Sequence, residues 1–208
     1  AAGPDRVMST FKHVIPTGIK HGTVTVMHEG EAIEVTTFRS EGEYTDGRHP
    51  DEVRFETDIV KDLLRRDFTI NAMAFDPCHD NQETGIVDPT SGQTDLARGV
   101  IRCVGDPLER FSEDGLRCLR AVRFASTLGF SIDQATLDAI KPTKDVFRKV
   151  AVERMTQELN KIMLSNNPGL GIDLMRFVGL FEEMLPKNEV GAIEDEETLF
   201  GVTKVLGN

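Results

Sequence analysis

Residues 112–125 read Ser-Glu-Asp-Gly-Leu-Arg-Cys-Leu-Arg-Ala-Val-Arg-Phe-Ala, and the rest of the chain is organised around them. They predict one helix, because Ser112 is a suitable N-cap and Glu113 and Asp114 place carboxylates in the first turn, where the helix dipole favours them. Two rows recur at every third position, an apolar row of Leu116, Leu119, Val122 and Ala125 and a polar row of Asp114, Arg117, Arg120 and Arg123. We expect one buried face and one face that presents an acid and three guanidiniums.

The polar face has two interpretations. As a solvated face, it would hold an ion pair between Asp114 and Arg117 worth a few tenths of a kcal/mol. As a nucleotide site, the aspartate would accept a hydrogen bond from an exocyclic amino group while the arginine donates to the adjacent ring nitrogen. Cytosine and adenine present that edge, whereas guanine and uracil present the reverse and would leave buried groups unpaired. Arg120 and Arg123 would then lie towards a triphosphate.

Several motifs follow one another in the order of a known enzyme family. Glu-Asp-x-x-Arg followed by Leu-Arg-Ala-x-Arg-Phe begins at Glu113, Arg-Arg-Asp-Phe-Thr-Ile-Asn-Ala occupies residues 65–72, and Val-Asp-Pro occupies residues 87–89. This pattern resembles the class II tRNA nucleotidyltransferases, the CCA-adding enzymes, and the related bacterial poly(A) polymerases. The resemblance runs from about residue 16 to about residue 164.

The resemblance implies an α/β (α+β) fold in three parts. Residues 1–98 would form a partial nucleotidyltransferase head sheet of the DNA polymerase β-like type, residues 99–165 a helical neck with the nucleotide-selecting helix, and residues 166–208 the start of a helical body. It also implies template-independent addition of C and A to the tRNA 3′ end from CTP and ATP with Mg²⁺. The alternatives are a poly(A) polymerase, an enzyme that adds only CC or only A, and a non-catalytic nucleotide- or RNA-binding remnant.

The motif at residues 65–72 adds candidate nucleotide-binding residues. Arg66 would contact phosphates, and Asp67 and Asn71 would bond the ribose hydroxyls, as the family motif implies, because acceptors and amides suit a sugar. The alternative for Asp67 and Asn71 is local capping of a helix break, which polar residues of this kind often provide.

A strand and a polar loop near the N-terminus carry the remaining candidates. Glu34 shares a strand face with Phe38. A strand glutamate is usually solvated, but the resemblance implies a carboxylate beside the catalytic pair, so Glu34 is a candidate third carboxylate. Residues 40–54 are typical of a mobile connecting loop. The resemblance implies that this is the flexible loop linked to the final adenosine addition, with the matching residues Glu41, Tyr44, Asp46 and Arg48.

Nucleotidyl transfer with two metal ions normally needs paired carboxylates. The family supplies them as Asp-x-Asp, a pattern that does not occur in these 208 residues, so no metal ligand is identified in this chain. We expect that the chain begins just after the catalytic strand and ends where the resembling enzymes continue into regions that hold tRNA. We also expect it to add no nucleotides by itself.

The composition indicates a globular protein, since 39% of the residues are hydrophobic. No apolar run approaches the roughly 20 residues that span a bilayer, so we expect no membrane partner and a cytoplasmic location. The formal charge of −11 argues against binding of nucleic acid by bulk charge, although arginines cluster within residues 98–123. Three separated cysteines predict reduced thiols, and five scattered histidines lack metal-ligand spacing.

Periodicity and turn signals predict the other elements. We expect two β-hairpins, formed by residues 22–27 with 32–38 and by residues 72–75 with 84–88. Helices are expected over residues 1–12, 58–67, 91–98, 134–140, 152–164 and 171–185, with a helical pattern from residue 100 to 128.

Overall fold

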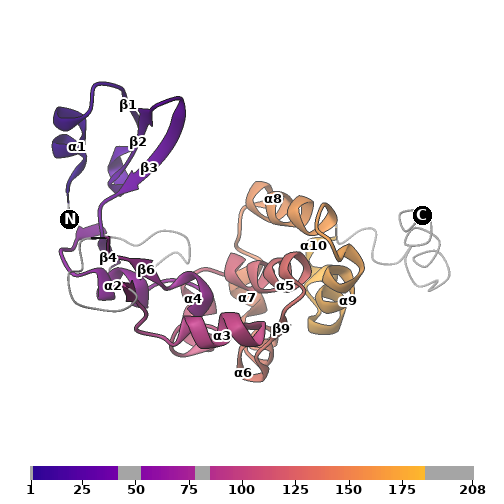
Figure 1. Cartoon of the computed structure of the whole chain (residues 1–208). Coiled ribbons are helices and arrows are strands. Elements are labelled where there is room, and N and C mark those ends of the chain that lie inside the picture. The colour runs from indigo at the N-terminus through magenta and orange to yellow at the C-terminus, as the bar shows by residue number, and fades with distance from the viewer. Residues whose placement is uncertain (1, 42–52, 78–84, 186–208) are drawn as a thin grey trace.

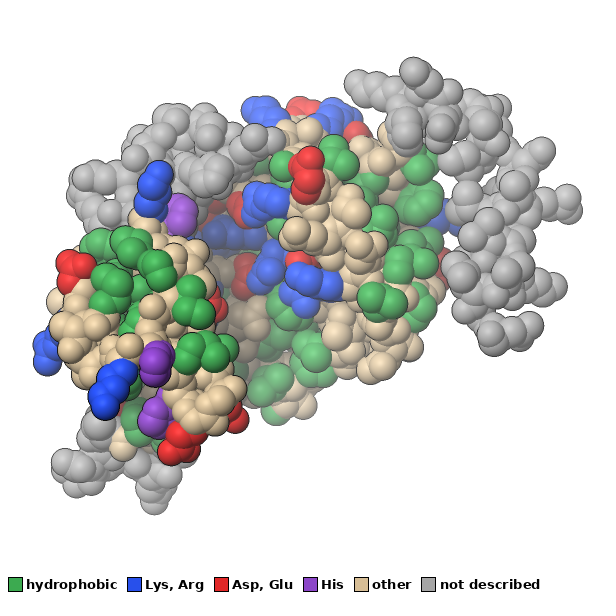
Figure 2. Space-filling view, turned by 90° about the horizontal axis from the view of Figure 1, so that it is seen from above, with side chains coloured by type: hydrophobic (Ala, Val, Ile, Leu, Met, Phe, Trp, Pro, Cys, Tyr) green, Lys and Arg blue, Asp and Glu red, His purple; other side chains and the backbone are tan. Residues whose placement is uncertain are grey.

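The computed structural model describes residues 2–41, 53–77 and 85–185. Figure 1 shows an elongated chain with a small sheet at the N-terminal end and a group of helices at the other end. The surface is hollowed between these two ends, and basic and acidic side chains gather in the hollow (Figure 2). The predicted mixture of antiparallel sheets and helices is confirmed.

The N-terminal end is an antiparallel sheet of three strands with one helix against it. Its elements are α1 (Pro4–Thr10), β1 (Val14–Gly18), the 3-10 turn η1 (Ile19–His21), β2 (Thr23–His28) and β3 (Glu31–Thr36). The predicted hairpin is confirmed, with Glu29 and Gly30 both at positive φ, as its tight turn requires. Val24 and Val26 pack with Val7 of α1 in a small core.

The middle of the chain is built from short elements. They are β4 (Arg39–Glu41), β5 (Val53–Phe55), α2 (Ile59–Leu64), the 3-10 turn η2 (Thr69–Asn71), β6 (Ala74–Phe75), β7 (Ile86–Val87) and α3 (Gly92–Arg98). The predicted pairing of residues 72–75 with 84–88 is confirmed by β6 and β7. Gly99 ends α3 in the left-handed conformation, as glycine does at many helix ends.

The C-terminal end consists of helices around one large core. Its elements are β8 (Val100–Ile101), α4 (Pro107–Glu113), α5 (Leu116–Leu128), β9 (Ser131–Ile132), α6 (Gln134–Asp138), η3 (Lys141–Thr143), α7 (Lys144–Phe147), α8 (Val152–Met163), α9 (Pro168–Val178) and α10 (Phe181–Met184). Helix α5 packs against both α8 and α9. The prediction of a helical pattern throughout residues 100–128 is wrong. Before α4 begins, residues 100–101 form the strand β8, which pairs in parallel with β9, a strand that follows α5.

The predicted single helix from Ser112 is also wrong. Asp106 caps α4 by accepting from two backbone N–H groups, and Pro107 occupies its first turn, so the start signal lies earlier in the chain. The chain then leaves the helical conformation at Asp114 and re-enters it as α5 after Gly115. The predicted apolar row is confirmed, since Leu116, Leu119, Val122 and Ala125 are all buried.

Two cysteines lie in the core of the C-terminal end. Cys103 and Cys118 are free thiols, and burial raises the pKa of both to about 12. This agrees with the prediction of reduced thiols for these two, while Cys78 lies outside the described residues. Within the described residues, every helix is too short or too polar to cross a bilayer.

Candidate nucleotide site

The break between α4 and α5 places a carboxylate at the start of α5. Asp114 has an extended backbone, and its Oδ1 accepts from the N–H of Leu116 at 3.1 Å. The guanidinium of Arg154, from the first turn of α8, donates to Oδ1 at 3.3 Å and to Oδ2 at 2.7 Å. A neighbouring N–H and an arginine forty residues away therefore fix this carboxylate together.

Arg117 follows on the first turn of α5 but does not lie on a solvated face, since only 9% of the residue is exposed. Its guanidinium donates to the Glu113 carboxylate, to the carbonyl of Arg110 at 3.0 Å and to the carbonyl of Arg65 at 3.4 Å. Glu113 is itself bridged to Arg110 at 2.7 Å. The interpretation of a solvated face is therefore wrong at Arg117, which is buried and bound to Glu113 and to backbone carbonyls.

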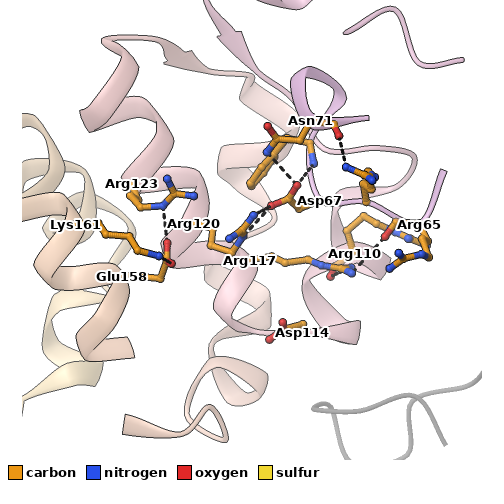
Figure 3. A network of polar contacts seen from close by, with 12 residues as sticks. Arg65, Asp67, Asn71, Arg110, Asp114, Arg117, Arg120, Arg123, Glu158 and Lys161 are labelled. Carbon is orange, nitrogen blue, oxygen red and sulfur yellow. Dashed lines mark hydrogen bonds and ion pairs between the residues drawn. The ribbon is translucent and has the colours of Figure 1, made fainter. Parts of the chain in front are cut away.

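Asp67 is the centre of the polar network in Figure 3. It is buried, and its Oδ1 accepts from the N–H of Phe68 at 2.8 Å and from the amide of Asn71 at 3.3 Å. Its Oδ2 accepts from Arg120 of α5, from Nε at 2.8 Å and Nη2 at 2.5 Å. Asp67 therefore makes local hydrogen bonds together with a long-range ion pair, although η2 itself begins without a side-chain cap.

Arg66 and Arg65 share a second acid, Asp62, on the buried side of α2. Arg65 donates to Asp62 at 2.8 Å and Arg66 at 3.2 Å, and the N–H of Arg39 adds a contact at 3.1 Å. Burial by itself raises the pKa of Asp62, but the hydrogen bonds from Arg65 and Arg39 outweigh it and hold the pKa below its usual value. Arg66 also donates to the carbonyl of Asn71 at 3.1 Å, and 44% of its side chain remains exposed.

Arg123 lies on the opposite edge of the network and faces α8. Its Nε donates to Glu158 at 2.5 Å, its guanidinium lies 3.7 Å from the ring centre of Phe124, and Lys161 contacts the same carboxylate at 2.8 Å. Burial raises the pKa of Glu158, but the hydrogen bond from Lys161 and the charge of Arg123 outweigh it and lower the pKa overall. Arg123, which was predicted to face a triphosphate, thus forms an ion pair that connects α5 with α8.

Polar contacts connect four of the predicted site residues, which lie around η2 and on α5: Arg66, Asp67, Asn71 and Arg120. Arg117 reaches the same region through the carbonyl of Arg65, and Asp114 lies at the α4–α5 break, where Arg154 holds it. Arg123 lies further along α5. Glu34 is exposed on β3, in the sheet at the other end of the molecule (Figure 1). Glu41 ends β4, and Tyr44, Asp46 and Arg48 lie outside the described residues.

The described residues do not fit a metal ion of the kind the resemblance implies. Within residues 2–41, 53–77 and 85–185, no three His, Cys, Asp or Glu side chains gather closely enough to hold one. Glu34 lies on β3 of the N-terminal sheet, whereas Asp67 lies in the middle of the chain between α2 and η2.

Two family models match the chain, and together they span most of it. The Poly A polymerase head domain matches residues 1–102, and the probable RNA and SrmB-binding site of polymerase A matches residues 129–190. A CCA-adding enzyme from Oceanobacillus iheyensis is 48% identical over 184 residues, which are 88% of this chain and 45% of that enzyme. One from Pediococcus pentosaceus is 47% identical over 175 residues, 84% of this chain and 43% of the relative.

The chain belongs to the poly(A) polymerase and CCA-adding enzyme family.

Solved structures agree with this family assignment. The Bacillus stearothermophilus CCA-adding enzyme in complex with CTP has a TM-score of 0.73 and 41% identity, covering 84% of this chain and 40% of that one. A tRNA nucleotidyltransferase complexed with a primer tRNA and an incoming ATP analog has a TM-score of 0.66 and 27% identity, covering 83% and 47%. The chain thus spans less than half the length of these relatives.

Sequence reasoning missed three residues of the candidate site. Asp62, Arg154 and Glu158 each hold a predicted site residue through an ion pair. Arg154 alone has a recognisable signal, because a cation in the first turn of a helix opposes the helix dipole and indicates an acidic partner elsewhere. The other two follow helical patterns that are equally typical of solvated faces.

Proposed function

We propose that this chain forms the nucleotide-selecting part of an enzyme that adds C and A to the 3′ end of tRNA from CTP and ATP. The proposal rests on the α4–α5 junction, where Asp114 follows the end of α4 and Arg117 lies in the first turn of α5. Further along α5, Arg120 pairs with Asp67, which also binds Asn71. The similarity to CCA-adding enzymes, including one in complex with CTP, supports it.

Base selection would follow from the donor and acceptor types at this junction. Asp114 would accept from the amino group of cytosine or adenine, and Arg117 would donate to the neighbouring ring nitrogen. The Glu113 carboxylate and the Arg110 carbonyl already hold the Arg117 guanidinium, so little side-chain freedom would be lost on binding. Guanine and uracil present the reverse edge, so both protein groups would lose their partners, which is costly in a desolvated site.

The remaining predicted residues would hold the sugar and the phosphates. Asp67 and Asn71 lie together and offer an acceptor and an amide to ribose hydroxyls. Arg66 has the exposed side chain that a phosphate contact needs. For Arg120 and Arg123, contact with a triphosphate would require them to release Asp67 or Glu158, so we propose this role for them only in the nucleotide-bound state.

For the complete enzyme we propose Mg²⁺ as the metal, a cytoplasmic location where tRNA is available, and Glu34 as a carboxylate of the catalytic centre. We also propose the loop residues Glu41, Tyr44, Asp46 and Arg48 as contributors to adenosine addition. We further propose a division into a head at 1–98, a neck at 99–165 and a body from 166, in which the head-domain match ending at residue 102 supports the first boundary.

Poly(A) addition is the second candidate, because both family models carry the name of polymerase A. Reaction products separate the possibilities in the complete enzyme, supplied with tRNA that lacks its last three nucleotides. CTP and ATP together should yield exactly three added nucleotides if the proposal holds. A long tail from ATP alone would establish a poly(A) polymerase, addition of only CC or only A would establish a partial enzyme, and no addition would favour a binding remnant.

Asp114→Ala tests the selecting helix directly. Loss of a hydrogen bond that only the correct base satisfies should cost about 1–3 kcal/mol, which lowers kcat/KM for CTP and ATP by roughly tenfold to a hundredfold or more. GTP and UTP never form that bond, so their low rates should fall little. Kinetics with all four nucleotides would measure this change. Unchanged CTP and ATP kinetics together with a lower melting temperature would show that Asp114 is only a helix cap.

A further inference from the structure

Arg154 contacts Asp114 in a geometry that suits orientation of the carboxylate. The two terminal nitrogens of its guanidinium donate to the two carboxylate oxygens, at 3.3 Å to Oδ1 and 2.7 Å to Oδ2. A two-pronged contact of this kind fixes the plane of the carboxylate as well as its position. Arg154 comes from α8 and Asp114 from the α4–α5 break, so the contact also crosses between separate elements.

The contact contributes less to folding than its geometry suggests. The Arg154 side chain is 39% exposed and that of Asp114 is 18% exposed, and solvent weakens ion pairs of this kind. Arg154 also lies in the first turn of α8, where the helix dipole disfavours a cation. An arginine at this place is therefore poorly explained by the stability of its own helix.

The carboxylate retains capacity for one more donor in this geometry. Oδ1 accepts from the Leu116 N–H and from Arg154, whereas Oδ2 accepts from Arg154. An ionised carboxylate offers about four acceptor sites, so Oδ2 can still receive a hydrogen bond from an amino group. Without Arg154, the Leu116 N–H would hold Oδ1 while Oδ2 could turn away.

We propose that Arg154 is a positioning residue for base selection, which fixes Asp114 so that Oδ2 meets the exocyclic amino group of cytosine or adenine. This inference rests on the proposed function, in which Asp114 reads the base. Arg154 acts only through Asp114, so its removal should affect CTP and ATP and leave GTP and UTP nearly unchanged.

The test compares binding of CTP, ATP, GTP and UTP by calorimetric titration of the 208-residue chain and its Arg154→Met variant. We expect the variant to bind CTP and ATP about tenfold more weakly and GTP and UTP within about twofold of the parent. Arg148→Met is the matched control, since Arg148 also pairs with acids of the helical end, Glu183 at 2.6 Å and Asp145 at 2.5 Å, away from Asp114. Its preference among nucleotides should not change.

A double-mutant cycle with Asp114→Ala separates positioning from general damage. In the Asp114→Ala background, Arg154→Met should change the affinities for CTP and ATP by less than about twofold, because the group that it orients is absent. An equal loss in both backgrounds would overturn the proposal. If Arg154→Met lowers the helical content, Arg154→Lys is used instead, because it keeps the charge without the fork, and parental nucleotide preference in that variant would also overturn the proposal.

The outcomes distinguish this inference from the proposed function. If the parent chain binds all four nucleotides equally, base selection by this helix is wrong. If the parent prefers CTP and ATP and the folded Arg154→Met variant keeps that preference, the proposed function stands and the positioning role of Arg154 is wrong.

Discussion

The sheet at the N-terminal end and the helices at the C-terminal end are stabilised in different ways. The sheet has a core of three buried side chains, Val7, Val24 and Val26, and leaves apolar side chains such as Ile15 and Ile33 exposed. The core of the helical end contains 18 buried hydrophobic residues, one of which is Phe68 from the middle of the chain, and the buried carboxylate of Glu158 forms an ion pair within the helical end. Because buried apolar area is the main source of stability, the helical end should be the stronger folding unit.

The part of the candidate nucleotide site that is proposed to select the base belongs to the stronger unit. Asp114, Arg117 and Arg120 lie on or beside α5, which packs between α8 and α9. Pre-organised groups bind with a smaller loss of conformational freedom. The difference between the two ends thus teaches that the residues proposed to select the base lie on the more extensively packed part of this chain.

The largest expected effect comes from a cavity in the helical core. Phe147 is fully buried, so Phe147→Ala should lower the free energy of unfolding by about 3–5 kcal/mol. Ile33→Ala in the sheet, where the side chain is 44% exposed, should change it by less than about 0.5 kcal/mol. Urea unfolding monitored by circular dichroism measures both. Similar losses for the two variants would refute the contrast between the ends.

A smaller effect is expected where α3 joins the middle of the chain to the helices. A Cβ on Gly92 would lie 2.2 Å from the carbonyl oxygen of Thr69, a backbone atom that cannot easily move. Gly92→Ala should therefore cost about 1–3 kcal/mol in the free energy of unfolding. Gly169→Ala in α9 is the control, because its Cβ would meet nothing within 4 Å, and it should leave stability unchanged or raise it by up to about 1 kcal/mol. A tolerated Gly92→Ala would show that this junction is loosely packed.

The smallest effect concerns pH and the Glu158 pair between α5 and α8. The folded pKa of Glu158 is below its ordinary value of 4.5, so its contribution to stability is complete above pH 4.5. That contribution is lost as the pH falls through the lowered folded pKa. In the Glu158→Gln variant, the melting temperature should therefore fall less steeply than in the parent as the pH is lowered from about 7 to about 3. An identical acid slope in parent and variant would contradict a role for this pair.

Local patterns predicted the apolar side of α5 but did not identify the partners of its polar side. Leu119 and Val122 are buried as their spacing predicted, because helical periodicity is a property of neighbouring residues. Arg120 instead pairs with an acid 53 residues earlier and Arg123 with one 35 residues later. A helical pattern contains no information about such distant contacts, so both arginines were predicted only to face a ligand or solvent.

The helix break and the parallel strands were missed for different reasons. The run through residues 112–125 is helical on both sides of Asp114, so its periodicity does not show that the backbone leaves the helix there. Strands β8 and β9 have two residues each, which is too short to show alternation. They also pair although α4 and α5 lie between them in the sequence. The family motifs were nevertheless recognisable, because they depend on residue identity and order.

Alkylation of the two buried thiols would report local unfolding of the helical end. A thiol reacts with alkylating reagents as the thiolate, and burial raises the pKa of Cys103 and Cys118 to about 12, so at neutral pH both are protonated as well as shielded. Alkylation must therefore wait until the surrounding helices separate. With Cys78 replaced by serine, the rate of alkylation, followed by mass spectrometry, would measure how often the helices separate. Cys118 lies on α5, so its alkylation would report the opening of the same helix that is proposed to read the base.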